Sequence, residues 1–271
     1  MTAVALLAAV AAMLSNSAAS MLESSGTRRA TADRPVWRQP RYLVGLAFDG
    51  TGWLLSVAAL RVLPVFAVQS VLAGSVPVTT VAAARGRRLP WPQVLAVGGV
   101  LLGVTLVAAS AAPGRAPRLP AAAPPVLLGV AMVLLLCLVP LLRSGHPLLM
   151  TVGAGAAYGG VSLAVRAVHV QSSLWTSVLD LLGEPLAYAI VVLGVVGTVL
   201  LARAMREGAV ATVVAVLAVT EVVVPGLVGL VLLGDRVRPG WAPALAAGWV
   251  LTTAGVVLLT RTPARPAVGT A

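Results

Sequence analysis

Residues 208–232 read GAVATVVAVLAVTEVVVPGLVGLVL, and this stretch decides the class of the protein. It is long and apolar enough to form a helix that crosses about 30 Å of hydrocarbon. Its only ionisable residue is Glu221, near the middle. A carboxyl group at the centre of a membrane helix costs roughly 2.5–3.5 kcal/mol, so it must face protein or water. The stretch therefore predicts a membrane helix with a functional carboxylate at its midpoint.

The composition of the whole chain agrees with this reading. Of the 271 residues, 59% are hydrophobic and 10% are charged, which is typical of a membrane protein with many spans and not of a soluble domain. The net charge is +11, and every basic residue is an arginine. Most of these arginines lie between apolar runs, as topology signals do, so we expect a lipid bilayer and no nucleic acid as the partner.

Apolar windows of about 17–25 residues mark the expected spans. We expect an all-α bundle of about nine transmembrane helices. Ten is the neighbouring count if residues 168–184, which could lie along the membrane surface, cross it instead. The nine windows are 3–22, 42–60, 64–84, 93–111, 125–142, 147–167, 185–205, 208–232 and 240–260.

The arginines predict the sidedness of the bundle. A cluster from Arg28 to Arg41 follows the first span, and the positive-inside rule places it in the cytoplasm. The amino terminus is then outside, the carboxyl terminus is cytoplasmic, and the location is a plasma membrane. Only six of the 19 arginines would lie outside: Arg61, Arg115, Arg118, Arg166, Arg236 and Arg238.

The two halves of the chain share a pattern. Spans two to four and spans seven to nine each contain a short break, a long helix interrupted by proline (Pro77 or Pro225), a charged turn and a glycine-bearing last helix. The predicted topology gives these units opposite orientations. We therefore expect an inverted repeat, with residues 1–124 as the first half and 125–271 as the second, as in many secondary transporters.

The end of the second unit resembles a known family. Leu233-Gly234-Asp235-Arg236-Val237, followed by a helix from Gly248 to Leu259, is similar to the end of each repeat in the drug/metabolite transporter (EamA-like) superfamily. The resemblance implies an inverted-repeat transporter that works by alternating access.

Three further stretches resemble the NIPA-type branch of magnesium transporters within that superfamily: 15–26, 45–84 and 185–235. Asp49 stands where that branch has glutamate, and Gly50-Thr51-Gly52-Trp53 replaces the polar and aromatic residues that usually follow. This resemblance implies Mg²⁺ as the alternative substrate, with Asp49 and Glu221 as its ligands.

Glu221 is the first candidate pathway residue. It could bind a cation or carry a proton, or, as a structural alternative, hydrogen-bond across a helix interface. Pro225 lacks the N–H that would bond to the Glu221 carbonyl, so it frees an acceptor and permits a hinge. Thr220 and Gln69 could line the same cavity or only join helices, and Pro77 is the corresponding hinge in the third span.

Three more charged residues have two readings each. Asp49 could be a second site in the cavity, or an acidic residue favoured by the dipole near a helix start. Glu184 forms an i, i+4 pair with Asp180 and could concentrate cations at an outer vestibule or be a solvated cap. For Arg166 we expect a side chain that reaches the headgroups, with pairing to that acidic pair as the alternative.

No phosphate-binding loop, nucleophile elbow or zinc spacing occurs, so we expect neither an enzyme nor a cofactor. The predicted function is secondary transport of a small solute, coupled to protons or cations. A magnesium transporter is the rival within transport, and a non-transporting scaffold or partner subunit is the alternative of another class. The sequence leaves the substrate, the direction, the coupling ion and the oligomeric state open.

Overall fold

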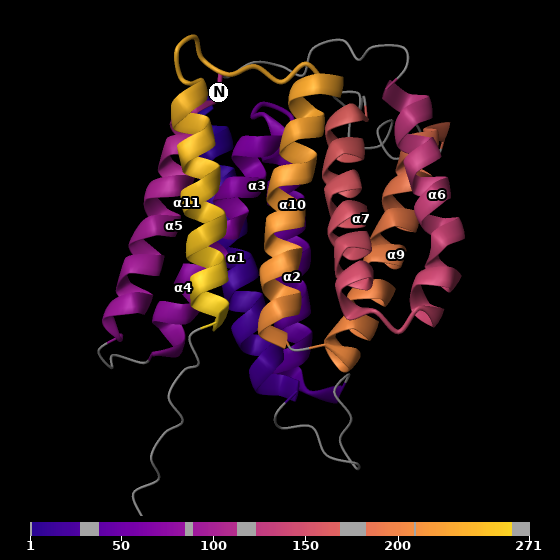
Figure 1. Cartoon of the computed structure of the whole chain (residues 1–271), viewed down its shortest axis with the longest axis horizontal. Helices are drawn as coiled ribbons and strands as arrows, with labels where there is room; N and C mark the ends of the chain where they lie inside the picture. Colours follow the sequence, from indigo (N-terminus) through magenta and orange to yellow (C-terminus); the bar gives the residue numbers. More distant parts are fainter. Residues whose placement is uncertain are drawn as a thin grey trace, which may run out of the picture.

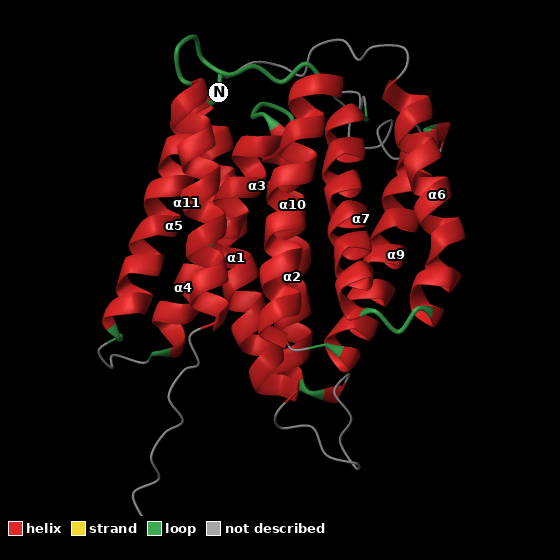
Figure 2. Cartoon of the chain, in the orientation of Figure 1, coloured by secondary structure: helices red, strands yellow, loops and turns green. Residues whose placement is uncertain are grey.

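The computed structural model describes residues 2–27, 38–84, 89–112, 123–168, 183–208 and 210–261, and these residues form helices and connecting turns (Figure 2). The helices are α1 (Thr2–Thr27), α2 (Pro40–Leu60), α3 (Val65–Ala73), α4 (Ser75–Ala83), α5 (Trp91–Ser110), α6 (Ala123–Arg143), α7 (Pro147–Ala167), α9 (Pro185–Glu207), α10 (Val210–Leu232) and α11 (Ala242–Arg261).

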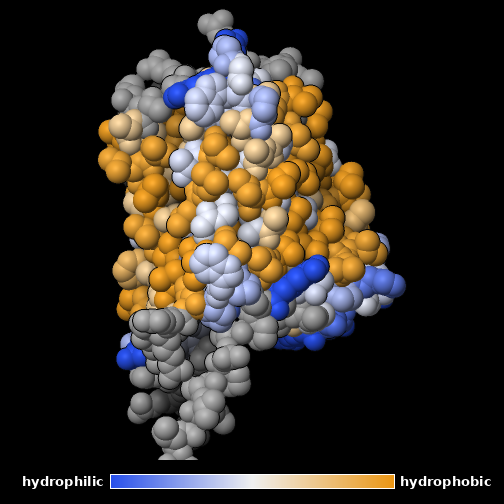
Figure 3. All heavy atoms as spheres, turned by 60° about the vertical axis from the view of Figure 1, so that its left-hand side comes forward, coloured by the Kyte–Doolittle hydropathy of each residue, from blue (hydrophilic) through white to orange (hydrophobic). Residues whose placement is uncertain are grey.

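Nine spans within the described residues are long and apolar enough to cross a membrane, and they confirm the nine predicted windows. Figure 3 shows the consequence on one face, where apolar side chains cover the middle of the molecule and polar side chains gather at the two ends. The chain is thus a multi-pass membrane protein. The surface stretch expected within 168–184 falls mostly outside the described residues.

Local sequence explains where several helices begin. Pro40, Pro147 and Pro185 each take the first helical position. Proline suits that position because its missing N–H would have no partner there and its φ angle is already helical.

The third span is one predicted helix that the structure divides in two. α3 ends at Ala73 and α4 begins at Ser75, with Gly74 between them. Pro77 lies just beyond this break and cannot donate to the carbonyl of Ala73, which weakens the helix at that point. The corresponding proline in the other unit, Pro225, lies inside a continuous α10.

The helices stand side by side, with the start of α1 and the end of α11 at opposite ends of the bundle (Figure 1). We call the end where α1 begins the amino-terminal side. α2, α5, α7 and α10 end there, and α3, α9 and α11 begin there (Figure 1). α1 packs against α2, α5 against α11, and α7 against both α9 and α10.

Small residues bring α5 and α11 into close contact. A Cβ atom added at Gly103 would lie 2.7 Å from the carbonyl oxygen of Gly248, and one added at Gly248 would lie 2.8 Å from that of Gly103. A Cβ at Gly255 would lie 2.9 Å from the carbonyl oxygen of Ala96. These glycines allow the two backbones to touch, as small residues do in membrane helix pairs.

Gly103→Ala is therefore expected to lower the thermal unfolding midpoint of the purified protein in detergent. The new methyl group would push against the α11 backbone, and such overpacking costs about 1–3 kcal/mol. Gly98→Ala in the same helix is the matched control, because nothing lies within 4 Å of its added Cβ. An equal loss of stability in both variants would contradict this packing account.

Candidate functional site

Arg166 is buried near the end of α7 and joins three segments of the chain. Its side chain is 3% exposed, and the paired Asp235 side chain is 0% exposed. Arg166 Nη2 lies 2.6 Å from Asp235 Oδ1, and Nε donates to the same oxygen at 2.9 Å. This pairing links the end of α7 to the loop that follows α10.

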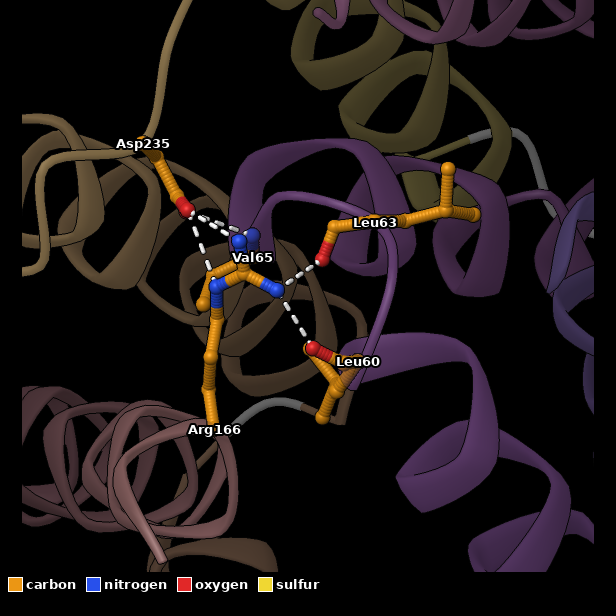
Figure 4. Close-up of polar contacts among 5 residues, drawn as sticks. All are labelled: Leu60, Leu63, Val65, Arg166 and Asp235. Carbon is orange, nitrogen blue, oxygen red and sulfur yellow. Dashed lines mark hydrogen bonds and ion pairs between the residues drawn. The ribbon is translucent and has the colours of Figure 1, made fainter. Parts of the chain in front are cut away.

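The same guanidinium also holds the turn between α2 and α3 (Figure 4). Arg166 Nη1 donates to the carbonyl oxygens of Leu60 and Leu63. The Val65 N–H, at the start of α3, donates to Asp235 Oδ2 at 2.7 Å. We call Arg166, Asp235, Leu60, Leu63 and Val65 the arginine clamp. It gathers the ends of α2, α7 and α10 on the amino-terminal side.

Two glycines let Asp235 enter the clamp. Gly234 has a φ of 66°, so the chain turns sharply after α10 and directs Asp235 inward. A Cβ at Gly229 would lie only 2.9 Å from Asp235 Oδ2, so a side chain there would displace the carboxylate. Burial raises the pKa of the Asp235 carboxyl group, whereas the Arg166 guanidinium and the Val65 N–H act in the opposite direction.

The clamp corrects two sequence-based expectations. The Arg166 side chain does not extend to the headgroups, because buried acceptors on three segments hold it inside the protein. Its acidic partner is Asp235, not the pair at 180 and 184. Glu184 lies at the N-cap of α9 without a side-chain capping bond, and Asp180 lies outside the described residues.

Glu221 lies halfway along α10, eleven residues from Val210 and eleven from Leu232. At 1.5 Å per residue it is about 16 Å from either end of the helix. It is partly buried, and within the described part of the chain its carboxylate has neither a hydrogen bond nor an ion pair.

Asp49 lies at a similar depth. It is eleven residues from Leu60, the end of α2 on the amino-terminal side, just as Glu221 is eleven residues from Leu232. α2 begins at Pro40, about 14 Å before Asp49, so a position in the first helical turn does not explain this carboxylate. The Asp49 side chain is exposed.

Tyr158 belongs to α7, which packs against both helices that carry the two carboxylates, α2 and α10. It lies on α7, nine residues before Ala167, and its phenol is within electrostatic range of both Glu221 and Asp49. Its hydroxyl is 3.2 Å from the Thr198 hydroxyl on α9. We call Asp49, Tyr158 and Glu221 the acidic layer. Glu23 on α1 interacts electrostatically with Asp49 and extends the layer away from the amino-terminal side.

The other predicted pathway residues lie around this layer. Gln69 is buried on α3, and its amide donates to the Ser162 hydroxyl on α7. The Thr220 hydroxyl donates to the Val216 carbonyl of its own helix. The Thr220 side chain packs against Gly155, where an added Cβ atom would lie 2.7 Å from the Thr220 Cβ atom. Pro225 packs in the same way against Gly159, where an added Cβ atom would lie 3.1 Å from the proline ring. Gly155 and Gly159 thus allow α7 and α10 to pack closely.

The two halves of α2 are buried by different parts of the protein. Near the clamp, Ser56, Ala59 and Leu60 are buried. In the other half the buried residues are Gly45 and Gly52, and each of them faces α1. Asp49 is exposed on the same face of α2 as Leu46 and Trp53, at a depth where an aspartate that faces hydrocarbon is costly.

A polar stripe on α7 was missed at the level of sequence. Thr151, Tyr158, Ser162 and Arg166 recur at helical spacing and lie along one side of that helix. The spacing was visible in the sequence, but their partners come from α3, α9 and the loop after α10. Partners so distant in sequence cannot be assigned from a helical period.

Within the described residues, no group of three or more His, Cys, Asp or Glu side chains could hold a metal ion. Comparison of the chain with protein-family models, curated proteins and solved structures gives no match.

Breaking the clamp is expected to destabilise the protein strongly. Asp235→Asn keeps the shape of the side chain but leaves the buried guanidinium without its counter-charge, a change that typically costs about 3–5 kcal/mol. The measurement is the thermal unfolding midpoint in detergent.

Arg203→Gln is the control, because Arg203 and Glu207 form an ion pair with side chains that are 49% and 25% exposed. Loss of an exposed pair costs about 1 kcal/mol or less. Similar midpoints for the two variants would show that the clamp does not hold the helix ends together.

Proposed function

We propose that this protein is a secondary transporter that moves a small solute by alternating access, with Glu221 as the coupling carboxylate and Asp49 as a second site. The observation that carries the proposal is the acidic layer: two carboxylates at matching depth near the middle of the bundle, both within electrostatic range of Tyr158. Ionisable groups at this depth are costly and are typical of ion and substrate pathways.

The surroundings of Glu221 suit reversible binding. A structural glutamate would be hydrogen-bonded across a helix interface, but the described residues give Glu221 no such partner. Pro225, one turn later, leaves the Glu221 carbonyl without its helical donor. A carboxylate beside a free carbonyl oxygen supplies two acceptors for a proton, a cation or a cationic solute.

The two ends of α2 differ as alternating access requires. On the amino-terminal side the arginine clamp ties α2, α7 and α10 together. Beyond Ser56, towards the start of α2, the buried residues Gly45 and Gly52 pack on α1, and the described contacts of the clamp do not reach this half. We infer a conformation closed on the amino-terminal side and open to the acidic layer from the opposite side.

Helix packing supports an inverted repeat. α1 packs against α2 and against α3 and α4, and α7 packs in the same way against α9 and α10. α5 and α11, the last helices of the two groups, pair with each other. α1 and α7 begin on opposite sides of the bundle (Figure 1), so the correspondence is inverted, as in many secondary transporters.

We further propose that the amino terminus is outside and the carboxyl terminus cytoplasmic, in a plasma membrane, as the distribution of arginines favours. The conformation would then be open to the cytoplasm. The resemblance of residues 233–237 and 248–259 to drug/metabolite transporters supports the proposal of alternating access. Mg²⁺ is the second candidate substrate, because Glu23 and Asp49 interact electrostatically and a largely hydrated Mg²⁺ needs only one or two carboxylates.

Transport is tested with the purified protein in proteoliposomes, by following proton flux, Mg²⁺ flux and uptake of the organic cation ethidium. Proton flux coupled to ethidium is expected for the primary proposal, and Mg²⁺ flux for the alternative. Glu221→Gln should reduce either flux at least about tenfold, because the amide cannot carry the charge.

Glu207→Gln is the matched control, because Glu207 ends α9 at the surface of the bundle. Its flux should equal that of the unaltered protein. Absence of all three fluxes would favour the scaffold alternative. Full activity of Glu221→Gln would contradict the role of Glu221 as the coupling carboxylate.

Water access to Asp49 is a separate prediction. Asp49→Cys, made in a Cys137→Ala background, should react with a membrane-impermeant thiol reagent added from the side where α2 begins. Leu63→Cys in the clamp turn should not react, because Leu63 is 4% exposed. Failure of Asp49→Cys to react from that side would place the residue away from an aqueous pathway.

A further inference from the structure

A groove of about 520 Å³ lies between α6 and α9, away from the acidic layer. Both helices end there, on the side opposite the amino-terminal side (Figure 1). α6 contributes Val139, Leu142 and Arg143, and α9 contributes a face that ends in Arg203 and Arg206. These residues recur at spacings of three and four, so one stripe of each helix faces the groove.

The groove is basic at its mouth. Arg143, Arg203 and Arg206 are exposed there. Glu207 neutralises Arg203 through a 2.6 Å ion pair, and the described residues supply no acidic partner to Arg143 or Arg206. Arg143 and Arg206 thus line the mouth from different helices without a counter-charge from the described chain.

The wall of the groove is apolar and continues onto the lipid-facing surface. Val139 and Val199 are 51% and 39% exposed and line the groove from opposite helices. α6 has the smallest buried share of the described spans, so its outer surface meets hydrocarbon. An occupant that suits this groove has an anionic head at the arginines and a chain along the two valines.

Arginines in the last turn of a helix also interact favourably with the helix dipole and obey the positive-inside rule. Those effects explain single arginines at each helix end. They do not account for the apolar groove that both arginines line at the ends of α6 and α9.

We propose that the groove between α6 and α9 binds an anionic phospholipid, with its phosphate between Arg143 and Arg206 and an acyl chain against Val139 and Val199. Basic pockets between transmembrane helices bind anionic headgroups in this way. The site is separate from the transport pathway and does not depend on the proposed function.

The proposal is tested by native mass spectrometry of the purified protein titrated with phosphatidylglycerol or phosphatidylcholine. Phosphatidylglycerol is expected to bind preferentially. Arg143→Gln with Arg206→Gln should weaken that binding by roughly tenfold or more, because each arginine near a membrane surface contributes to the attraction. Arg261→Gln is the control, since Arg261 is also an exposed arginine in the last turn of a spanning helix, on the same side.

Val199→Trp fills the apolar part of the groove and keeps every charge, so it should also release phosphatidylglycerol. A tenfold excess of inorganic phosphate should not displace the lipid. Equal binding of the two lipids, equal effects of the Arg261 and the Arg143/Arg206 substitutions, unchanged binding by Val199→Trp, or displacement by phosphate would each overturn the proposal.

Discussion

The buried pairing of Arg166 with Asp235 is the interaction on which the arrangement of the helices depends. Both side chains are almost fully buried, and the same guanidinium satisfies the carbonyls of Leu60 and Leu63. An unpaired charge in this place would be very costly, so the ends of α2, α7 and α10 must stay together whenever the pair forms. Small residues then set how closely the helices pack below it. Gly155 admits Thr220, and Gly103 and Gly248 bring α5 against α11.

This constraint acts on one side only, and the acidic layer lies beyond it. α2 is tied to α7 through the clamp, but its other half is covered by α1 within the described residues. In the conformation that we propose, Asp49 and Glu221 are closed off on the side of the clamp and less constrained on the other side. If the clamp opens and the opposite halves of α2 and α7 close, the same carboxylates would face the other side. Such an exchange needs two helix packings of similar free energy. The arginine clamp would be formed in one of these packings and open in the other.

The sequence predicted the spans well because each is a long apolar run with proline or charge at its ends. It also predicted the midpoint position of Glu221, since that depends only on counting residues within one helix. It did not predict that Arg166 pairs with Asp235, because that contact joins residues 69 positions apart. It missed Tyr158, whose importance arises from two carboxylates on other helices. Local sequence patterns predict the position and length of each helix. The site depends on contacts between helices, which these patterns do not predict.

The most direct test of the account measures the separation of α2 and α10 on the open side. Spin labels at positions 46 and 212, both exposed, report it by double electron–electron resonance in a Cys137→Ala background. The account predicts two separations whose populations change between acidic and alkaline buffer and no longer change in Glu221→Gln. A single separation that is independent of pH would contradict alternating access controlled by Glu221.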